Sequence, residues 1–152
     1  MINIKNKLIL IATPEELKLV DELGFKGYPV LITGVGGMNV IKSTTCIAKD
    51  TEIINIGYCG SNSLPIGKKV NISLSKTYHE TADFYELPTE FFGQDDGVVC
   101  YTSTDFVTHT DIKEPCVFDM ELAFICSLFE NVRAIKKVSD NLSLNEYEKN
   151  CL

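Results

Sequence analysis

Short apolar segments alternate with stretches of helical periodicity along most of the chain. The apolar segments have strand length, and the longer periodic stretches have helix length. Strands are expected at residues 7–12, 29–33, 52–56, 69–74, 97–101 and 132–138, and helices at residues 13–23, 38–48, 118–129 and 144–150. Residues 77–94 are expected to form a loop. This alternation predicts the α/β class, with three layers and a mixed, mostly parallel sheet flanked by helices.

Length and composition fit a single domain spanning residues 1–152. Hydrophobic residues make up 45% of the chain and charged residues 23%, which is ordinary for a globular protein. The net charge of -7 argues against nucleic acid as a partner, because a phosphate backbone needs a cationic surface. A small neutral ligand remains compatible with this charge.

The first apolar run, Leu8 to Ala12, is too short for a signal sequence or a membrane span, so a cytoplasmic protein without a membrane partner is expected. The six cysteines form no C-x-x-C pair, which argues against a zinc knuckle or a thioredoxin-type motif. Most of them lie in apolar runs, and we expect small buried side chains in a reducing compartment.

Polar and glycine-rich segments follow several of the predicted strands. They comprise residues 13–16, 33–37, 55–60, 102–107 and 139–140. Ligands of α/β sheets bind at the carboxyl ends of the strands, so these segments predict a shared site.

Asp119 and Glu121 begin a predicted helix that is apolar nearly all round and should therefore be buried. A buried carboxylate needs a partner, because an unpaired buried charge is costly. In the structural interpretation, Asp119 caps the helix and Glu121 favours its positive end. In the functional interpretation, Glu121 accepts hydrogen bonds from ligand hydroxyl groups such as a ribose diol.

Ser139 and Asp140 follow the last predicted strand, and they also allow two interpretations. They cap the next helix, or Asp140 donates a proton to a leaving base. Donation at neutral pH requires surroundings that raise the pKa of the carboxyl group.

The segments 34–37, 55–61, 78–83, 103–106, 118–121 and 139–140 together resemble the purine nucleoside phosphorylase and nucleosidase superfamily. Their order and spacing are most similar to the methylthioadenosine/S-adenosylhomocysteine nucleosidases, and the resemblance covers nearly the whole chain. Asp119-Met120-Glu121 with Ser139-Asp140 is its most specific part.

The resemblance implies a role for each matching residue. Met120 would pack against the ribose, and Glu121 would hold its hydroxyl groups. Asp140 would hydrogen-bond or protonate the purine, with Ser139 orienting it. The remaining expected roles are base stacking for Phe106, reading of the base edge for the Val107 backbone, water activation for Glu16, and the water or phosphate pocket for Thr33 and Gly34.

The chain departs from the family in three places. It stops soon after Asp140, which predicts an exposed carboxyl with an unraised pKa. Its one arginine, Arg133, lies inside a predicted strand, whereas phosphate clamps need arginine in the pocket, so hydrolysis is favoured over phosphorolysis. Glu16 also fits a capping box with Thr13, which would be a structural use of the same carboxylate.

Other functions fit the sequence less well. Asn39 occupies the third glycine position of a dinucleotide motif, and the spacing from Gly60 to Lys69 is not that of a P-loop. His79-Glu80-x-x-Asp83 lacks the second histidine of a metalloprotease helix, and no cysteine has a clear histidine partner. No metal and no cofactor is therefore expected.

The predicted activity is hydrolysis of the N-glycosidic bond of an adenine-type nucleoside, with a small-molecule nucleoside as the partner. A degenerate, non-catalytic nucleoside-binding protein and a phosphate-dependent phosphorylase are the alternatives. The resemblance also implies a homodimer.

Overall fold

The computed structural model describes residues 7–78, 87–92 and 96–152. Strands and helices alternate along the chain as the pattern of apolar segments predicts. In chain order the elements are β1 (Lys7–Ile11), the 3-10 helix η2 (Pro14–Glu16), α1 (Leu17–Glu22), β2 (Val30–Ile32), α2 (Gly37–Thr44), β3 (Glu52–Ser61), β4 (Lys69–Thr77), β5 (Glu90–Phe91), β6 (Val98–Thr102), β7 (Cys116–Asp119), α3 (Leu122–Leu128), β8 (Asn131–Asp140) and α4 (Leu144–Cys151).

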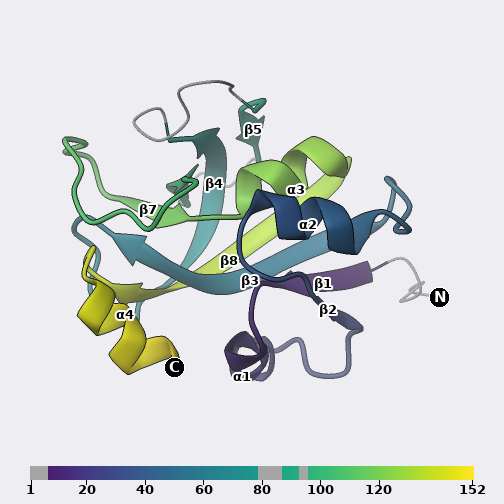
Figure 1. Ribbon diagram of the computed structural model, residues 1–152, viewed down its shortest axis with the longest axis horizontal. Coiled ribbons are helices and arrows are strands. Elements are labelled where there is room, and N and C mark those ends of the chain that lie inside the picture. Colours follow the sequence, from purple (N-terminus) through teal and green to yellow (C-terminus); the bar gives the residue numbers. More distant parts are fainter. Residues whose placement is uncertain (1–6, 79–86, 93–95) are drawn as a thin grey trace.

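The described strands form one mixed sheet in the order β2-β1-β3-β7-β6-β4-β5, and β8 pairs with both β3 and β4. Because β8 joins β3 to β4, the strands β3, β7, β6, β4 and β8 close into a ring (Figure 1). Most of the pairings are parallel, including β1 with β3 and β3 with β8. The expected α/β class with a mostly parallel sheet is confirmed.

Helices cover both faces of the sheet, which explains why the consecutive residues Ile9, Leu10 and Ile11 of β1 are all buried. Ile9 points to the face where α1 packs, in a cluster with Val20. Leu10 points to the other face, where it contacts Val40 of α2 and Ile125 of α3. Figure 1 shows α2 and α3 side by side over that second face, with α1 on the opposite side of the sheet.

Three predicted element boundaries differ from the structure. Residues 57–61 continue β3 beyond its predicted end at residue 56, because both β7 and β8 pair with this end of the strand. Residues 118–119 belong to β7, and the helix predicted from residue 118 begins at Leu122. The last strand extends through Ser139 to Asp140. The closing helix appears as α4, close to its predicted limits.

The six cysteines are free thiols, and four of them are buried. In the part of the chain that the structure describes, no helix combines the length and apolar character needed to cross a bilayer.

Candidate active site

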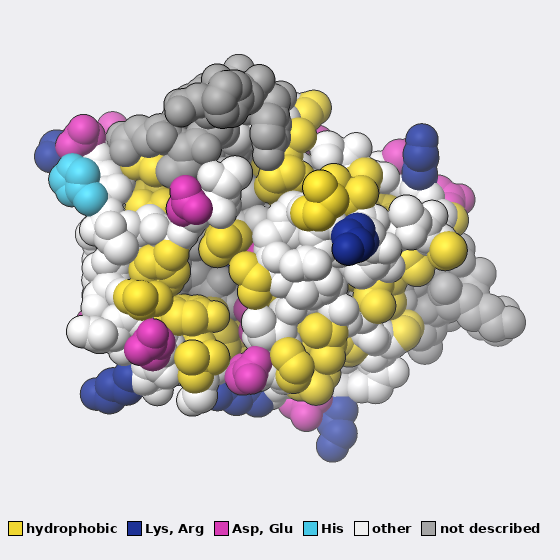
Figure 2. All heavy atoms as spheres, viewed as in Figure 1, with side chains coloured by type: hydrophobic (Ala, Val, Ile, Leu, Met, Phe, Trp, Pro, Cys, Tyr) yellow, Lys and Arg dark blue, Asp and Glu magenta, His cyan; other side chains and the backbone are white. Residues whose placement is uncertain are grey.

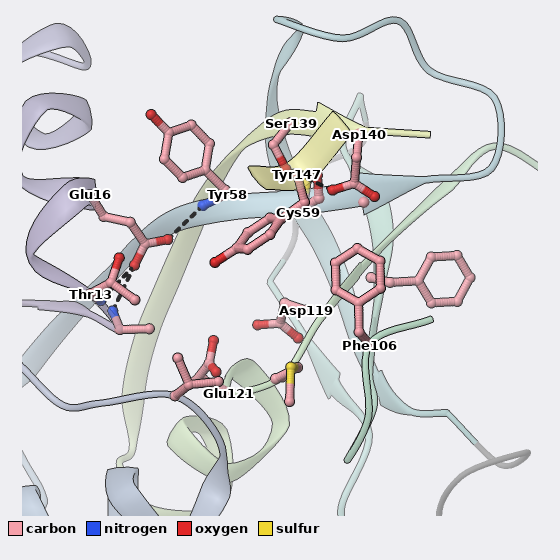
Figure 3. Close-up of a pocket in the computed structure, with 15 residues that line it drawn as sticks. Thr13, Glu16, Tyr58, Cys59, Phe106, Asp119, Glu121, Ser139, Asp140 and Tyr147 are labelled. Carbon is pink, nitrogen blue, oxygen red and sulfur yellow. Dashed lines mark hydrogen bonds between the residues drawn. The ribbon is translucent and has the colours of Figure 1, made fainter. Parts of the chain in front are cut away.

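A pocket of about 210 Å³ lies where β1, β3, β7 and β8 end against α4. It opens on the face seen in Figure 2, and Figure 3 shows its side chains converging from both sides. The lining residues are Ala12, Thr13, Glu16, Val35, Tyr58, Cys59, Gly60, Phe106, Phe118, Asp119, Met120, Glu121, Ser139, Asp140 and Tyr147. The pocket therefore brings together Glu16, Glu121 and Asp140, which are far apart in the sequence.

Glu121 lies at the N-terminal end of α3 and is 9% exposed. Its Oε2 accepts a hydrogen bond of 2.8 Å from the backbone N–H of Gly36, which ties the carboxyl to the glycine turn before α2. Gly36 has a φ of 88°, a conformation that glycine adopts without strain. Burial, reinforced by the neighbouring Asp119, raises the pKa of Glu121 to about 8. One carboxylate oxygen is thus anchored while the side chain faces the pocket.

Asp119 connects the floor of the pocket to the start of α3. Its Oδ1 accepts a hydrogen bond of 2.6 Å from the Thr102 hydroxyl, and its Oδ2 accepts one of 2.8 Å from the Leu122 N–H. The second bond satisfies a free amide of the first helical turn, as the structural interpretation of Asp119 predicts. This capping fixes the direction in which Met120 and Glu121 leave the strand.

Lys136 is buried beneath these groups, with an exposed fraction of 1%. Its ammonium group donates to Asp119 Oδ2 at 3.1 Å and to the side-chain oxygen of Asn55 at 2.5 Å. Burial opposes the charged form of Lys136, but the neighbouring carboxylates, Asp119 foremost, hold its pKa above the usual range, so the lysine stays charged. Sequence reasoning missed this residue. The available indication was its position in the strand: Lys136 lies on the same face as the apolar residues Ala134 and Val138.

Asp140 lies at the other end of the pocket and is 1% exposed. Its Oδ1 accepts a hydrogen bond of 2.8 Å from the Ser139 hydroxyl, and its Oδ2 accepts one of 3.0 Å from the Leu142 N–H. Burial raises the pKa of Asp140, although these hydrogen bonds act in the opposite direction. The carboxyl is therefore shifted towards the protonated form that a proton donor requires.

The expectation that a short C-terminal segment would leave Asp140 exposed is wrong. The chain turns back immediately after the strand, with Leu142 at a φ of 64°, and α4 then packs along β8. The side-chain amide of Asn150 on α4 donates to the Ser139 carbonyl at 2.8 Å. Ser143, which accepts a bond from the Glu146 N–H, caps α4, so Asp140 remains free of that structural role.

Glu16 is 6% exposed and accepts three backbone hydrogen bonds. Oε1 accepts from Ala12 at 2.7 Å and from Thr13 at 3.1 Å, and Oε2 accepts from Tyr58 at 2.7 Å (Figure 3). The bond from Thr13 is the glutamate half of the capping box that the sequence predicts. Burial raises the pKa of Glu16. Because each carboxylate oxygen can accept two bonds, Oε2 keeps an acceptor position in addition to the capping contacts.

Apolar and aromatic side chains form the wall between these carboxyl groups. Phe106 and Tyr147 lie edge to face, with ring centroids 5.6 Å apart, and Met120 lies between Asp119 and Glu121 on the pocket lining. A smaller cavity of about 30 Å³ adjoins the pocket and is lined by Val107 together with Phe106 and Asp140. Tyr147 was not singled out from the sequence, because a tyrosine in a short terminal helix gives no signal of pocket position.

Thr33 and Gly34 do not line either cavity. The Thr33 hydroxyl donates to the Gly34 carbonyl at 2.8 Å and to the Ile11 carbonyl at 3.3 Å, and these bonds hold the turn that carries Val35 into the pocket. His79, Glu80 and Asp83 lie outside the described residues. Among the described side chains, no group of three or more potential metal ligands is arranged to hold an ion.

The pocket lining contains acidic, apolar and small polar residues, and no lysine or arginine belongs to its described part. Arg133 lies elsewhere, with its guanidinium group 6.0 Å from the ring centroid of Phe25. Lys136 reaches the site only from below, where its donors engage Asp119 and Asn55. The lining thus offers no bidentate clamp for a phosphate.

No protein-family model matches the chain, and neither does any curated protein. Solved structures do match it, and they show that the chain shares its fold with nucleosidases and a futalosine hydrolase. The S-adenosylhomocysteine nucleosidase of Streptococcus pyogenes aligns with a TM-score of 0.70 at 18% identity, over 95% of this chain and 89% of its own.

Two further structures show the same likeness. The methylthioadenosine/S-adenosylhomocysteine nucleosidase of Streptococcus pneumoniae has a TM-score of 0.69 at 18% identity, over 95% of this chain and 91% of its own. The futalosine hydrolase of Helicobacter pylori has a TM-score of 0.68 at 15% identity, over 95% and 90%. The resemblance stated from the sequence motifs is thereby confirmed at the level of the fold.

Proposed function

We propose that this protein hydrolyses the N-glycosidic bond of an adenine-type nucleoside. The observation that carries the proposal is a single pocket lined by Glu121, Asp140 and Glu16, with aromatic and apolar side chains between these carboxyl groups. Three buried carboxyl groups with raised pKa values give such a pocket both proton donors and acceptors. The fold shared with solved nucleosidases supports the same reaction class.

Asp140 is the proposed proton donor to the base. Breaking the bond between the anomeric carbon and the base nitrogen leaves positive charge on the sugar and negative charge on the base. Transfer of the Asp140 proton to a purine nitrogen neutralises the base as it departs. Ser139 orients the carboxyl through its 2.8 Å hydrogen bond, and Phe106 gives the base an aromatic surface for stacking. The Val107 backbone, at the adjoining cavity, would read the base edge.

Glu121 is the proposed ribose ligand. Its Oε2 is held by Gly36, and an ionised carboxylate accepts bonds from the two sugar hydroxyl groups. Met120, its neighbour on the lining, provides an apolar contact for the sugar. Glu16 would position the attacking water and take its proton, so that the water oxygen bonds to the anomeric carbon. The backbone bonds that fix Glu16 hold this acceptor rigidly.

Water is the proposed acceptor of the sugar because the described lining lacks a cationic phosphate clamp.

We also propose a homodimer in the cytoplasm. Exposed apolar side chains support the dimer: Met38 is 70% exposed, and Val35 and Ile41 are 44% and 41% exposed. This patch lies on and beside α2, and Figure 2 shows hydrophobic side chains over this part of the molecule. Val35 belongs both to the patch and to the pocket lining, so a second chain there would border the site.

Chromatography of free base tests the activity. The protein is incubated with methylthioadenosine, S-adenosylhomocysteine, adenosine and inosine, each with and without inorganic phosphate. Release of adenine without phosphate is expected. Absence of base release from every nucleoside contradicts the enzyme, and nucleoside binding in calorimetry would then identify a non-catalytic binding protein. Release only with phosphate would identify a phosphorylase.

A further inference from the structure

One lysine is buried among the carboxyl groups beneath the pocket. Lys136 lies in the middle of β8, paired through the backbone with Gly57 of β3 on one side and Val70 of β4 on the other. It is the largest of the fully buried side chains in the described part of the chain. An ammonium group is costly to bury, and apolar residues of similar size often stabilise a fold equally well. Its presence therefore points to a requirement of the site.

A glycine on the neighbouring strand leaves space for the Glu16 carboxyl beside this lysine. A Cβ atom at Gly57 would lie 2.6 Å from Oε2 of Glu16 and 3.5 Å from Nζ of Lys136. The missing side chain thus lets the Glu16 carboxyl lie against β3 near the Lys136 ammonium group. Asp119 and Asn55 complete the surroundings with hydrogen bonds of 3.1 and 2.5 Å.

The lysine is connected to the ribose-binding segment through Asp119. The carboxylate that accepts from Lys136 also accepts from the Leu122 amide, at the first residue of α3, and from Thr102. Met120 and Glu121 lie between these anchored points and project into the pocket. A shift of Lys136 would therefore move both proposed ribose contacts.

Lys136 also acts electrostatically on the Glu121 carboxyl. The titratable groups around Glu121 are Asp119 on β7, Lys136 on β8, Glu16 on η2 and Tyr147 on α4. Asp119 and Glu16 disfavour the ionised form of Glu121, and Lys136 favours it. The Gly36 amide at the start of α2 acts in the same direction as the lysine.

We propose that Lys136 is a positioning residue of the nucleoside site, which fixes Asp119-Met120-Glu121 and favours the ionised form of Glu121, the form that binds the ribose hydroxyl groups. This inference rests on the proposed function for the identity of the ligand. Its structural basis is the buried contact of Lys136 with Asp119 and Asn55.

The test is the pH profile of kcat/KM for methylthioadenosine in wild type, Lys136→Met and Lys136→Arg. Lys137→Met is the matched control, since Lys137 is partly exposed and pairs with Glu22 on the surface. The rising limb of this pH profile should report the ionisation of Glu121. Lys136→Met should move that limb to higher pH. A displacement of one unit lowers the ionised fraction at pH 7 by about tenfold, and the lost activity should return as the pH rises. Lys136→Arg should retain the wild-type limb, as should Lys137→Met.

A double variant covers the case in which Lys136→Met does not fold. Asp119→Asn/Lys136→Met removes both members of the buried ion pair, and the loss of the Asp119 charge should return the limb to the wild-type position or below it. An unchanged limb in Lys136→Met, or equal loss at every pH, would overturn the proposal.

Carbon NMR titration of the Glu121 carboxyl separates this inference from the proposed function. The midpoint should be higher in Lys136→Met than in wild type, and lower again in the double variant. Equal midpoints in wild type and Lys136→Met would overturn the role of Lys136. Failure of wild type to release base would contradict the proposed function while leaving this titration decisive for the lysine.

Discussion

At the residue scale, similar carboxyl groups have different surroundings and hence different proposed tasks. Asp119 meets an ammonium group, a hydroxyl and an amide, and it serves as an anchor. Burial raises the pKa values of Glu121 and Asp140, which line the two ends of the pocket. Glu16 is held by three amides, so its orientation is fixed. Local electrostatics, and not residue type, distinguishes an anchor from a reactive group.

Asp140→Asn should remove the proton donor without disturbing the pocket. An asparagine has nearly the same shape, but it cannot protonate a leaving base. We expect kcat for methylthioadenosine to fall by about 10²- to 10⁴-fold, with little change in nucleoside binding measured by calorimetry. Asp111→Asn, at an exposed aspartate that contacts His109, is the control and should keep wild-type kcat. Full activity in Asp140→Asn would contradict the mechanism.

The raised pKa of Glu121 predicts a pH dependence of stability. The folded protein holds a proton on Glu121 up to a pH of about 8, whereas the unfolded chain loses it near 4.5. Between these values unfolding releases a proton, so the free energy of unfolding should fall as the pH rises, by up to about 1.4 kcal/mol per pH unit. Urea unfolding at pH 5 to 9 measures this slope. Glu121→Gln should flatten it, and an unaltered slope in that variant would exclude Glu121 as its source.

At the element scale, the site depends on how closely β3 approaches the ends of β8 and η2. The sequence predicts that this strand ends at residue 56, where a glycine-containing segment follows the apolar run. In the structure the strand continues, and the glycines provide space for carboxyl groups from other elements. A single sequence does not distinguish a glycine required by its own backbone from one required by its neighbours. The boundary between β7 and α3 likewise depends on a neighbouring element, because residues 116–119 form a strand by pairing with β6.

Gly60→Ala tests this close approach. The added Cβ would lie 2.9 Å from Oδ2 of Asp140 and 3.3 Å from Cδ2 of Leu142, which should displace the carboxyl from its amide bond. We expect a loss of about 1–3 kcal/mol in the free energy of unfolding and at least a tenfold fall in kcat. Gly27→Ala is the control, because Gly27 has a φ of 94° with open space around it. That variant should lose stability but keep kcat, and equal kcat values in the two variants would contradict this role of Gly60.

At the scale of the whole molecule, the predicted fold class and the order of the elements agree with the structure, because both follow from apolar periodicity. The motifs around Glu121 and Asp140 meet in one pocket. The cover of Asp140 was not predictable, since it depends on a turn with Leu142 in a left-handed conformation and on the packing of α4. The role of Lys136 was not predictable from the sequence, because its partners, Asn55 and Asp119, come from two other strands.

The exposed apolar patch on α2 predicts the oligomeric state. Burial of Met38 and Ile41 between two chains would remove apolar area from water. Sedimentation velocity of the wild type should give the mass of two chains, and Met38→Glu should give the mass of one. Lys42→Glu, on the same helix, is the charge control and should remain dimeric. A monomeric wild type would contradict the dimer.

The most direct test of the central claim is hydrolysis of methylthioadenosine in water enriched in oxygen-18, without phosphate. Mass spectrometry of the sugar product, quenched before exchange at the anomeric carbon, identifies the atom that replaces the base. The account predicts one oxygen-18 atom in each released sugar, one equivalent of free adenine, and loss of both products in Asp140→Asn. Unchanged methylthioadenosine after prolonged incubation with folded wild-type protein would contradict it.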